Sequence, residues 1–135
     1  MRELLIDFGA DVGAYRGDEN GNSSLHVACA SGNISMVKFF LENNADNNGR
    51  SNYGNTPLKL AIMNVEDQKR LESIVDLLIE HDADVNIADH EGVTPLHTAS
   101  AKKNVCIVKK LLTNKANPNK KDNQGASVLH YAFAK

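Results

Sequence analysis

Eight residues, Gly92-Val93-Thr94-Pro95-Leu96-His97-Thr98-Ala99, are typical of the start of a helix. The hydroxyl of Thr94 can cap the helix by accepting a hydrogen bond from a backbone N–H of the first turn. Pro95 suits the first helical position, because the N–H that it lacks would have no intrahelical partner there. Gly92 allows the tight turn before the cap. The stretch therefore predicts a helix capped by Thr94.

The same frame occurs three more times along the chain. Residues 54–61 are a close copy, and residues 21–28 and 125–132 are looser ones. The glycine that opens each copy stands at position 21, 54, 92 or 125, so the steps are 33, 38 and 33 residues. A fixed period of this length indicates stacked units, each of which contacts only its neighbours.

A period of about 33 residues with a Thr-Pro-Leu-His motif resembles the ankyrin-repeat family, over essentially the whole chain. The resemblance implies an all-α solenoid of stacked helix–turn–helix units with projecting β-hairpin-like fingers. It also implies one domain, residues 1–135, with a partial repeat at 1–17, full repeats at 18–50, 51–88 and 89–121, and a partial repeat at 122–135. The longer step of 38 residues marks the repeat at 51–88 as one with an insertion.

Each full repeat also contains an apolar stripe that predicts an outer helix. The apolar residues recur at i, i+1, i+4 and i+5, as they do on one face of a helix. The stripes are Met36, Val37, Phe40 and Leu41; Ile74, Val75, Leu78 and Ile79; and Ile107, Val108, Leu111 and Leu112. We expect Leu96 and Leu111 in the core, and no outer helix over Leu129 or Phe133. The additional residues lie within 64–71, where a charged run favours a helix longer by about a turn over a loop.

Length and composition narrow the functional class. The chain of 135 residues is long enough for one core, and no apolar run approaches the length of a membrane span. Its two cysteines, Cys29 and Cys106, fall in helical segments of different repeats, which argues against a disulfide framework. We therefore expect a reducing compartment, the cytoplasm or the nucleus.

Polar residues that recur do so once per repeat, which is typical of architecture rather than of an active site. We predict no enzymatic activity, no cofactor and no metal ion. His26, His97 and His130 share one repeat position, and in ankyrin-like repeats this histidine bridges to a neighbouring loop and to the Ser or Thr at its own helix start. Lys59 holds the position in the second full repeat, so the bridge is expected to be absent or altered there.

Asn86 carries a modification signal. Leu78 followed by Asp84-Val85-Asn86 resembles the site that asparaginyl hydroxylases modify in ankyrin-repeat proteins. The alternative, which we favour, is that Asp-Val-Asn is the family's usual start of a finger, where the asparagine bonds backbone groups.

The function that the resemblance implies is protein–protein binding, as a scaffold or adaptor, through a concave groove of fingertips and inner helices. Carried over position by position, the groove residues are Glu19, Asn20, Asn22, Arg50, Asn52, Tyr53, Asn55, Met63, His90, Glu91, Val93, Lys102, Lys121, Asn123 and Gln124. Tyr53 and Met63 are the expected apolar anchors.

The distribution of charge bears on the partner. Residues 1–90 carry 7 basic and 15 acidic side chains, net −8, whereas residues 91–135 carry 8 and 2, net +6. The lysines are either a solvated surface or a site for a partner that is acidic toward the C-terminal end. Nucleic acid is not an expected partner, because these lysines fall on different helix faces without aromatic residues for stacking.

A second interpretation remains open. The domain could be the targeting module of a larger enzyme or secreted effector whose catalytic part lies elsewhere. The predicted pattern begins and ends inside repeats, which favours a longer array or half-repeats that act as caps.

Overall fold

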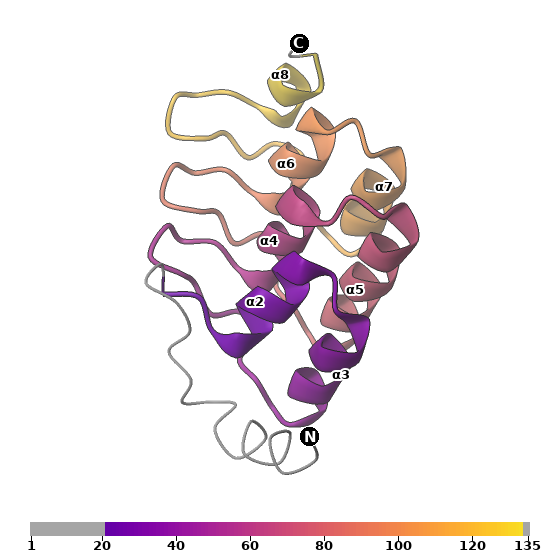
Figure 1. Cartoon of the computed structure of the whole chain (residues 1–135). Helices are drawn as coiled ribbons and strands as arrows, with labels where there is room; N and C mark the ends of the chain where they lie inside the picture. Colours follow the sequence, from indigo (N-terminus) through magenta and orange to yellow (C-terminus); the bar gives the residue numbers. More distant parts are fainter. Residues whose placement is uncertain (1–20, 134–135) are drawn as a thin grey trace.

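The computed structural model describes residues 21–133, and over this range it contains seven helices and, as its only β pairing, a bridge between Lys121 and Ser127. Figure 1 shows the helices in two columns, with the hairpin fingers projecting from the inner column. The inner helices are α2 (Ser24–Ser31), α4 (Pro57–Asn64), α6 (Pro95–Ala101) and α8 (Val128–Phe133). The outer helices are α3 (Ile34–Glu42), α5 (Gln68–Glu80) and α7 (Val105–Thr113). The predicted all-α repeat solenoid is confirmed; the partial repeat at 1–17 lies outside the described residues.

The inner helices start where the repeated octapeptide predicts. The hydroxyl oxygen of Thr94 accepts a hydrogen bond from the backbone N–H of His97, and Pro95 occupies the first turn of α6. Thr56 and Pro57 have the same roles at the start of α4. The caps satisfy backbone donors that the first turn of a helix leaves unpaired, which explains why these residue types recur with the period of the fold.

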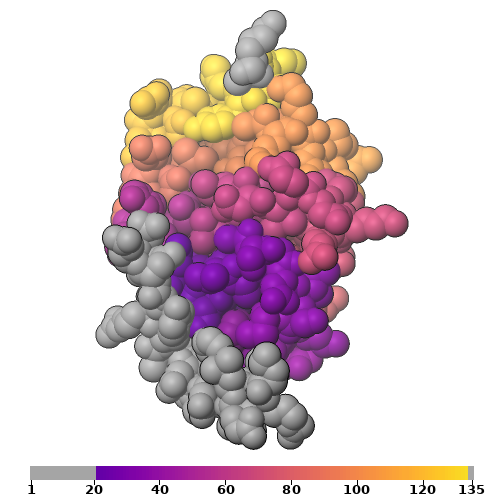
Figure 2. All heavy atoms as spheres, in the orientation of Figure 1, coloured from indigo at the N-terminus to yellow at the C-terminus, as the bar shows by residue number. Residues whose placement is uncertain are grey.

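The turns between stacked fingers need glycine for two reasons. Gly54 and Gly92 have φ angles of 85° and 81°, which favour glycine. A Cβ atom on Gly54 would lie 2.7 Å from the backbone nitrogen of His90, and one on Gly92 would lie 2.8 Å from that of Asn123. The fingers therefore stack through backbone contact, and Figure 2 shows the resulting layers following one another in sequence order.

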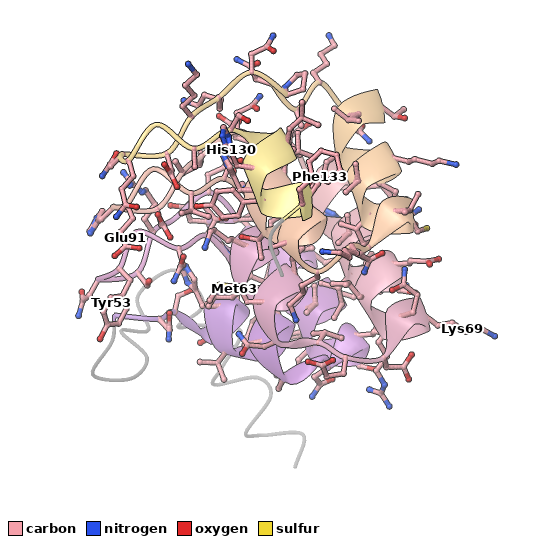
Figure 3. All side chains as sticks on the ribbon, turned by 90° about the horizontal axis from the view of Figure 1, so that it is seen from above. Tyr53, Met63, Lys69, Glu91, His130 and Phe133 are labelled. Carbon is pink, nitrogen blue, oxygen red and sulfur yellow. The ribbon has the colours of Figure 1, made fainter. Side chains whose placement is uncertain are left out.

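The core lies between the two columns of helices. Leu96 and Leu111 are both buried there, as predicted. The stripe on α7 is narrower than the sequence suggests, since Val108 is half-buried and Leu112 is exposed. On α8, Leu129 and Phe133 are 66% and 79% exposed, as expected without an outer helix over them. Figure 3 shows Phe133 beside α8.

The insertion in the second full repeat is an additional helical turn. Helix α5 has 13 residues where α3 and α7 have 9 each, so the predicted helix extension is confirmed. Its first turn packs rather than projecting, because Leu71 is buried in the core. Arg70 donates from its guanidinium to the carbonyl of Gly32 at 3.0 Å. On the other side, the amides of Gln68 and Asn104 exchange hydrogen bonds of 3.1 and 2.9 Å. The additional turn thus joins both neighbouring repeats.

Candidate functional site

The fingertips form a continuous edge beside the inner helices. Fingertips 51–55, 89–93 and 122–126 are each closed by one backbone hydrogen bond of 2.9 Å between their first and last residues. They are also joined to one another, because the N–H of His90 donates to the carbonyl of Tyr53 at 3.1 Å and that of Asn123 donates to Glu91 at 2.9 Å. We call these three fingertips, together with the neighbouring exposed side of α4 at Met63, the finger surface.

Two large apolar side chains are exposed on the finger surface. The side chain of Tyr53 is 63% exposed, and that of Met63 is 37% exposed. Figure 3 shows both on the same side of the helices as Glu91. The backbone that carries Tyr53 is held in place by Ser51, whose hydroxyl accepts its N–H, and by His90. An exposed ring on a fixed backbone is ready to bind a partner without first being ordered.

The predicted groove residues fall into four groups. The exposed group contains Arg50, Asn52, Tyr53, Met63, His90, Glu91, Lys102, Lys121, Asn123 and Gln124. Asn22 and Val93 are half-buried, and Asn55 is buried. Glu19 and Asn20 lie outside the described residues.

Three members of that set have contacts that the sequence did not indicate. Asn55 lies inside the stack, where its side-chain oxygen accepts a hydrogen bond from Lys59 at 3.2 Å. Arg50 reaches the next repeat and donates to the carbonyl of Ala88 at 2.9 Å. Lys102 lies at the end of α6, and its ammonium is 3.7 Å from the carboxylate of Glu66.

His26 and His97 bridge the repeats as expected, whereas His130 contacts Ser127 at its own helix start. Nε2 of His26 is 2.8 Å from the carbonyl oxygen of Asn55, and Nε2 of His97 is 3.3 Å from that of Ala126. Nδ1 of each ring accepts the backbone N–H of the residue that caps its own helix, at 3.1 Å for both. Because a carbonyl only accepts and an N–H only donates, both rings must be neutral with the proton on Nε2. Burial lowers the pKa of His97 below its usual range, consistent with the neutral form.

Lys59 replaces this bridge with a buried ion pair. The lysine is almost fully buried, and its ammonium lies 3.1 Å from the carboxylate of Asp89 on the next fingertip. Burial by itself raises the pKa of Asp89, but the N–H of Val93 and the charge of Lys59 outweigh it, and the net pKa is lowered. The sequence predicted an altered bridge at Lys59 but did not identify its partner.

Asp89 has a structural counterpart in Asp122. One carboxylate oxygen of each closes its own fingertip: that of Asp89 accepts the N–H groups of Glu91 and Val93, and that of Asp122 accepts those of Gln124 and Ala126. The second oxygen differs in its partner, because that of Asp122 accepts the hydroxyl of Tyr131 at 2.5 Å. Burial and this hydrogen bond raise the pKa of Tyr131 to about 12.

Asn86 joins two repeats through its amide. Its Nδ2 donates to the carbonyl of Lys115 at 3.0 Å, and its Oδ1 accepts the N–H of Asn117 at 2.7 Å. Asn48, one repeat earlier, accepts the N–H of Asp84 in the same way at 2.7 Å. The backbone-bonding interpretation of Asn86 therefore has direct support in these contacts, whereas its hydroxylation stays a prediction.

The described residues offer little nucleophilic or metal-binding chemistry. Cys29 is buried, and burial raises the pKa of its thiol. A hydrogen bond with Glu72 raises the pKa of Cys106, so neither thiol is activated. Between residues 21 and 133, no group of three or more His, Cys, Asp or Glu side chains is placed to hold a metal ion. No helix in the same range has the length and apolar character needed to cross a bilayer.

Comparison with known proteins identifies this architecture. A family model described as ankyrin repeats (3 copies) matches residues 1–89 and 65–135. The chain is 36% identical over 92 residues, 68% of its length, to a transient receptor potential cation channel subfamily A member 1 homolog of Caenorhabditis elegans. It is 37% identical over 102 residues, 75% of its length, to the human neurogenic locus notch homolog protein 2. It is 31% identical over 98 residues, 73% of its length, to the E3 ubiquitin-protein ligase KEG of Arabidopsis thaliana. These matches span only 7%, 4% and 6% of the three relatives.

Proposed function

The chain belongs to the ankyrin-repeat family, and on that premise we propose that it is an interaction module whose protein or peptide partner lies along the finger surface. Domains of this family typically mediate protein–protein interaction and are not themselves catalytic. We propose that the module acts as a scaffold or adaptor in the cytoplasm or nucleus, where the free thiols of Cys29 and Cys106 would stay reduced.

The exposed pair of Tyr53 and Met63 is the observation that carries this proposal. Tyrosine is enriched among the residues that dominate binding energy at interfaces, and methionine adapts to varied partner surfaces. The fingertips around the pair are joined by backbone hydrogen bonds, so binding would order few additional groups. Neither side chain belongs to the core between the helix columns, which leaves both available to a partner.

A displayed library of random peptides, selected against the immobilised chain, tests the proposal. Tyr53→Ala should weaken the selected peptides by about 1–3 kcal/mol, because truncation removes the anchor, and should leave the unfolding midpoint nearly unchanged. Leu112→Ala is the matched control, since it truncates an exposed apolar side chain on an outer helix.

The competing arrangement places the partner on the outer helices. If selected peptides bind Tyr53→Ala and Met63→Ala as well as the wild type, and bind Lys109→Glu poorly, the finger surface is not the binding site.

The second candidate is that the module targets a larger enzyme or effector. One matched relative is named an E3 ubiquitin-protein ligase, and the match covers 6% of it. This candidate concerns what the module is joined to rather than which surface binds. A fusion of residues 1–135 to a fluorescent reporter tests this candidate: the module alone should bring the reporter to the site of its partner, and a reporter that stays evenly distributed would contradict it.

A further inference from the structure

A small polar pocket lies on the finger surface between fingertips 89–93 and 122–126. Its volume is about 190 Å³, and its lining residues are Glu91, Val93, Asp122, Asn123, Gln124 and Tyr131. The lining has two carboxylates, two amides, one aromatic ring and one small apolar side chain, and it contains no basic residue. The pocket is thus concave and negatively charged.

The neighbouring layer shows what such a fingertip carboxylate binds. Asp89 closes its own fingertip with one oxygen and holds the ammonium of Lys59 with the other, at 3.1 Å. At the position equivalent to Lys59, the next inner helix has His97, which is neutral and points its Nε2–H to the carbonyl of Ala126. Asp122 therefore repeats the geometry of Asp89 without the cation.

The two carboxylates of the pocket retain capacity for hydrogen bonds. Asp122 accepts two backbone N–H groups and the hydroxyl of Tyr131, which uses three of the roughly four lone-pair sites of a carboxylate. The carboxylate of Glu91 has no hydrogen bond or ion pair within residues 21–133. The hydrogen bonds to Asp122 lower its pKa, so it stays ionised at neutral pH.

We propose that this pocket receives a lysine or arginine side chain of the bound partner, whose cation pairs with Glu91 and Asp122 beside the ring of Tyr131. The proposal rests on the finger surface being the binding site and specifies the chemistry of its partner there. Arginine fits best, because its planar fork can pair with a carboxylate through two parallel hydrogen bonds and can stack on an aromatic ring.

The charges around the pocket agree with a basic side chain. Lys102 is one of the lysines in residues 91–135 that offered a site for an acidic partner, and it pairs with Glu66 instead of lining the pocket. Lys121 and His90 are exposed beside the two fingertips, but neither is among the lining residues. An acidic partner segment would have to face Glu91 and Asp122 at this point of the surface.

Nuclear magnetic resonance titration of the ¹⁵N-labelled chain with N-acetyl-arginine methylamide tests the pocket directly. We expect saturable shifts of the amide signals of residues 91–93 and 122–126, with a dissociation constant in the millimolar range, as for a single weak contact. N-acetyl-citrulline methylamide has nearly the same shape without the charge and should leave these signals unchanged.

Two variants assign the effect to the pocket. Glu91→Gln removes an exposed charge and should weaken binding of the arginine probe about 2–5-fold, the range for an exposed ion pair. Glu66→Gln removes the same charge at the other end of the helices and should have no effect. Equal shifts with citrulline, no saturable shift at residues 91–93 and 122–126, or full binding by Glu91→Gln would overturn the proposal. Preferential binding of N-acetyl-glutamate methylamide in the pocket would also overturn it and would support an acidic partner instead.

The outcomes also separate this proposal from the proposed function. The arginine probe reports on the pocket without any selected peptide. If the probe binds while Tyr53→Ala does not weaken peptide binding, the pocket proposal is supported and the proposed finger-surface interface is contradicted. If peptides depend on Tyr53 while the probe does not bind, the finger surface stands and the basic partner residue is wrong.

Discussion

Two layers of the stack join an inner helix to the next fingertip in different ways. Between the third full repeat and the final partial repeat, the neutral ring of His97 joins its own helix cap to the carbonyl of Ala126. Between the second and third full repeats, the ammonium of Lys59 joins the carboxylate of Asp89. In the next repeat the histidine needs only a backbone carbonyl, which every residue supplies, whereas the lysine needs an acid at one position. A bridge between two charged side chains therefore makes the residue type at position 59 depend on the residue type at position 89.

The largest expected effect breaks the charged bridge. Asp89→Ala leaves the buried ammonium of Lys59 without its counter-ion and should lower the free energy of unfolding by about 3–5 kcal/mol. Asp122→Ala is the control, because it removes the equivalent fingertip hydrogen bonds and a neutral one from Tyr131 without leaving a cation buried, and it should cost clearly less. Urea unfolding at neutral pH measures both. Equal losses would mean that the ion pair with Lys59 adds no stability beyond the hydrogen bonds of the fingertip.

The next effect tests whether the two layers share the same core. Leu78 on α5 and Leu111 on α7 occupy equivalent positions of the outer stripe, and both are fully buried. Truncation of either to alanine should cost about 2–5 kcal/mol, since each leaves a cavity. Hydrogen exchange should show the loss of protection in adjacent repeats, fading with distance. A loss confined to distant repeats would contradict nearest-neighbour stacking.

A smaller effect concerns the additional turn, which lies only in the layer of Lys59. Arg70→Ala removes the hydrogen bond to the carbonyl of Gly32 and should cost about 0.5–1.5 kcal/mol. Lys69→Ala is the matched control, because its side chain projects away from the helices in Figure 3, and it should change stability by less than about 0.5 kcal/mol. Equal effects in thermal unfolding would show that the turn is held by its apolar side alone.

The smallest expected effect is a difference between the two layers in how their contribution to stability depends on pH. The folded pKa of His97 is lowered, so its contribution is complete above the unfolded pKa of about 6.5 and is lost as pH falls through the folded value. The contribution of Asp89 is lost only at more acidic pH, below its unfolded value of about 3.9. His97→Gln should therefore reduce the loss of stability in the window that opens as pH falls below about 6.5, and leave the more acidic limb unchanged. A profile that does not change in that window would contradict the assignment.

The repeated residues were the part of the structure that the sequence could predict. Helix starts at Thr56 and Thr94, the core position of Leu96 and the bridges of His26 and His97 all follow from a pattern that recurs with the fold's own period. The lengthening of α5 was also predictable, because charged helix formers filled the additional length.

Features that occur once were not predictable in the same way. The pairing of Lys59 with Asp89 depends on how closely an inner helix approaches the next fingertip, and that distance is a property of the stack rather than of either residue. The inward orientation of Asn55 and the contact between Lys102 and Glu66 have the same origin. The exposure of Tyr53 and Met63 was expected, since neither fits a position that the stack fills.

Asn48 illustrates a consequence of stacking for the chemical lifetime of the chain. It precedes Gly49, and an asparagine before glycine is prone to deamidation, because the unhindered following nitrogen can attack the side-chain carbonyl. In the stack that carbonyl oxygen accepts the N–H of Asp84 at 2.7 Å, which restrains the rotation of the side chain that the attack requires. Ageing at Asn48 should therefore proceed mainly in molecules whose first and second full repeats have separated. The slow gain of one mass unit at this residue would record how often the stack opens.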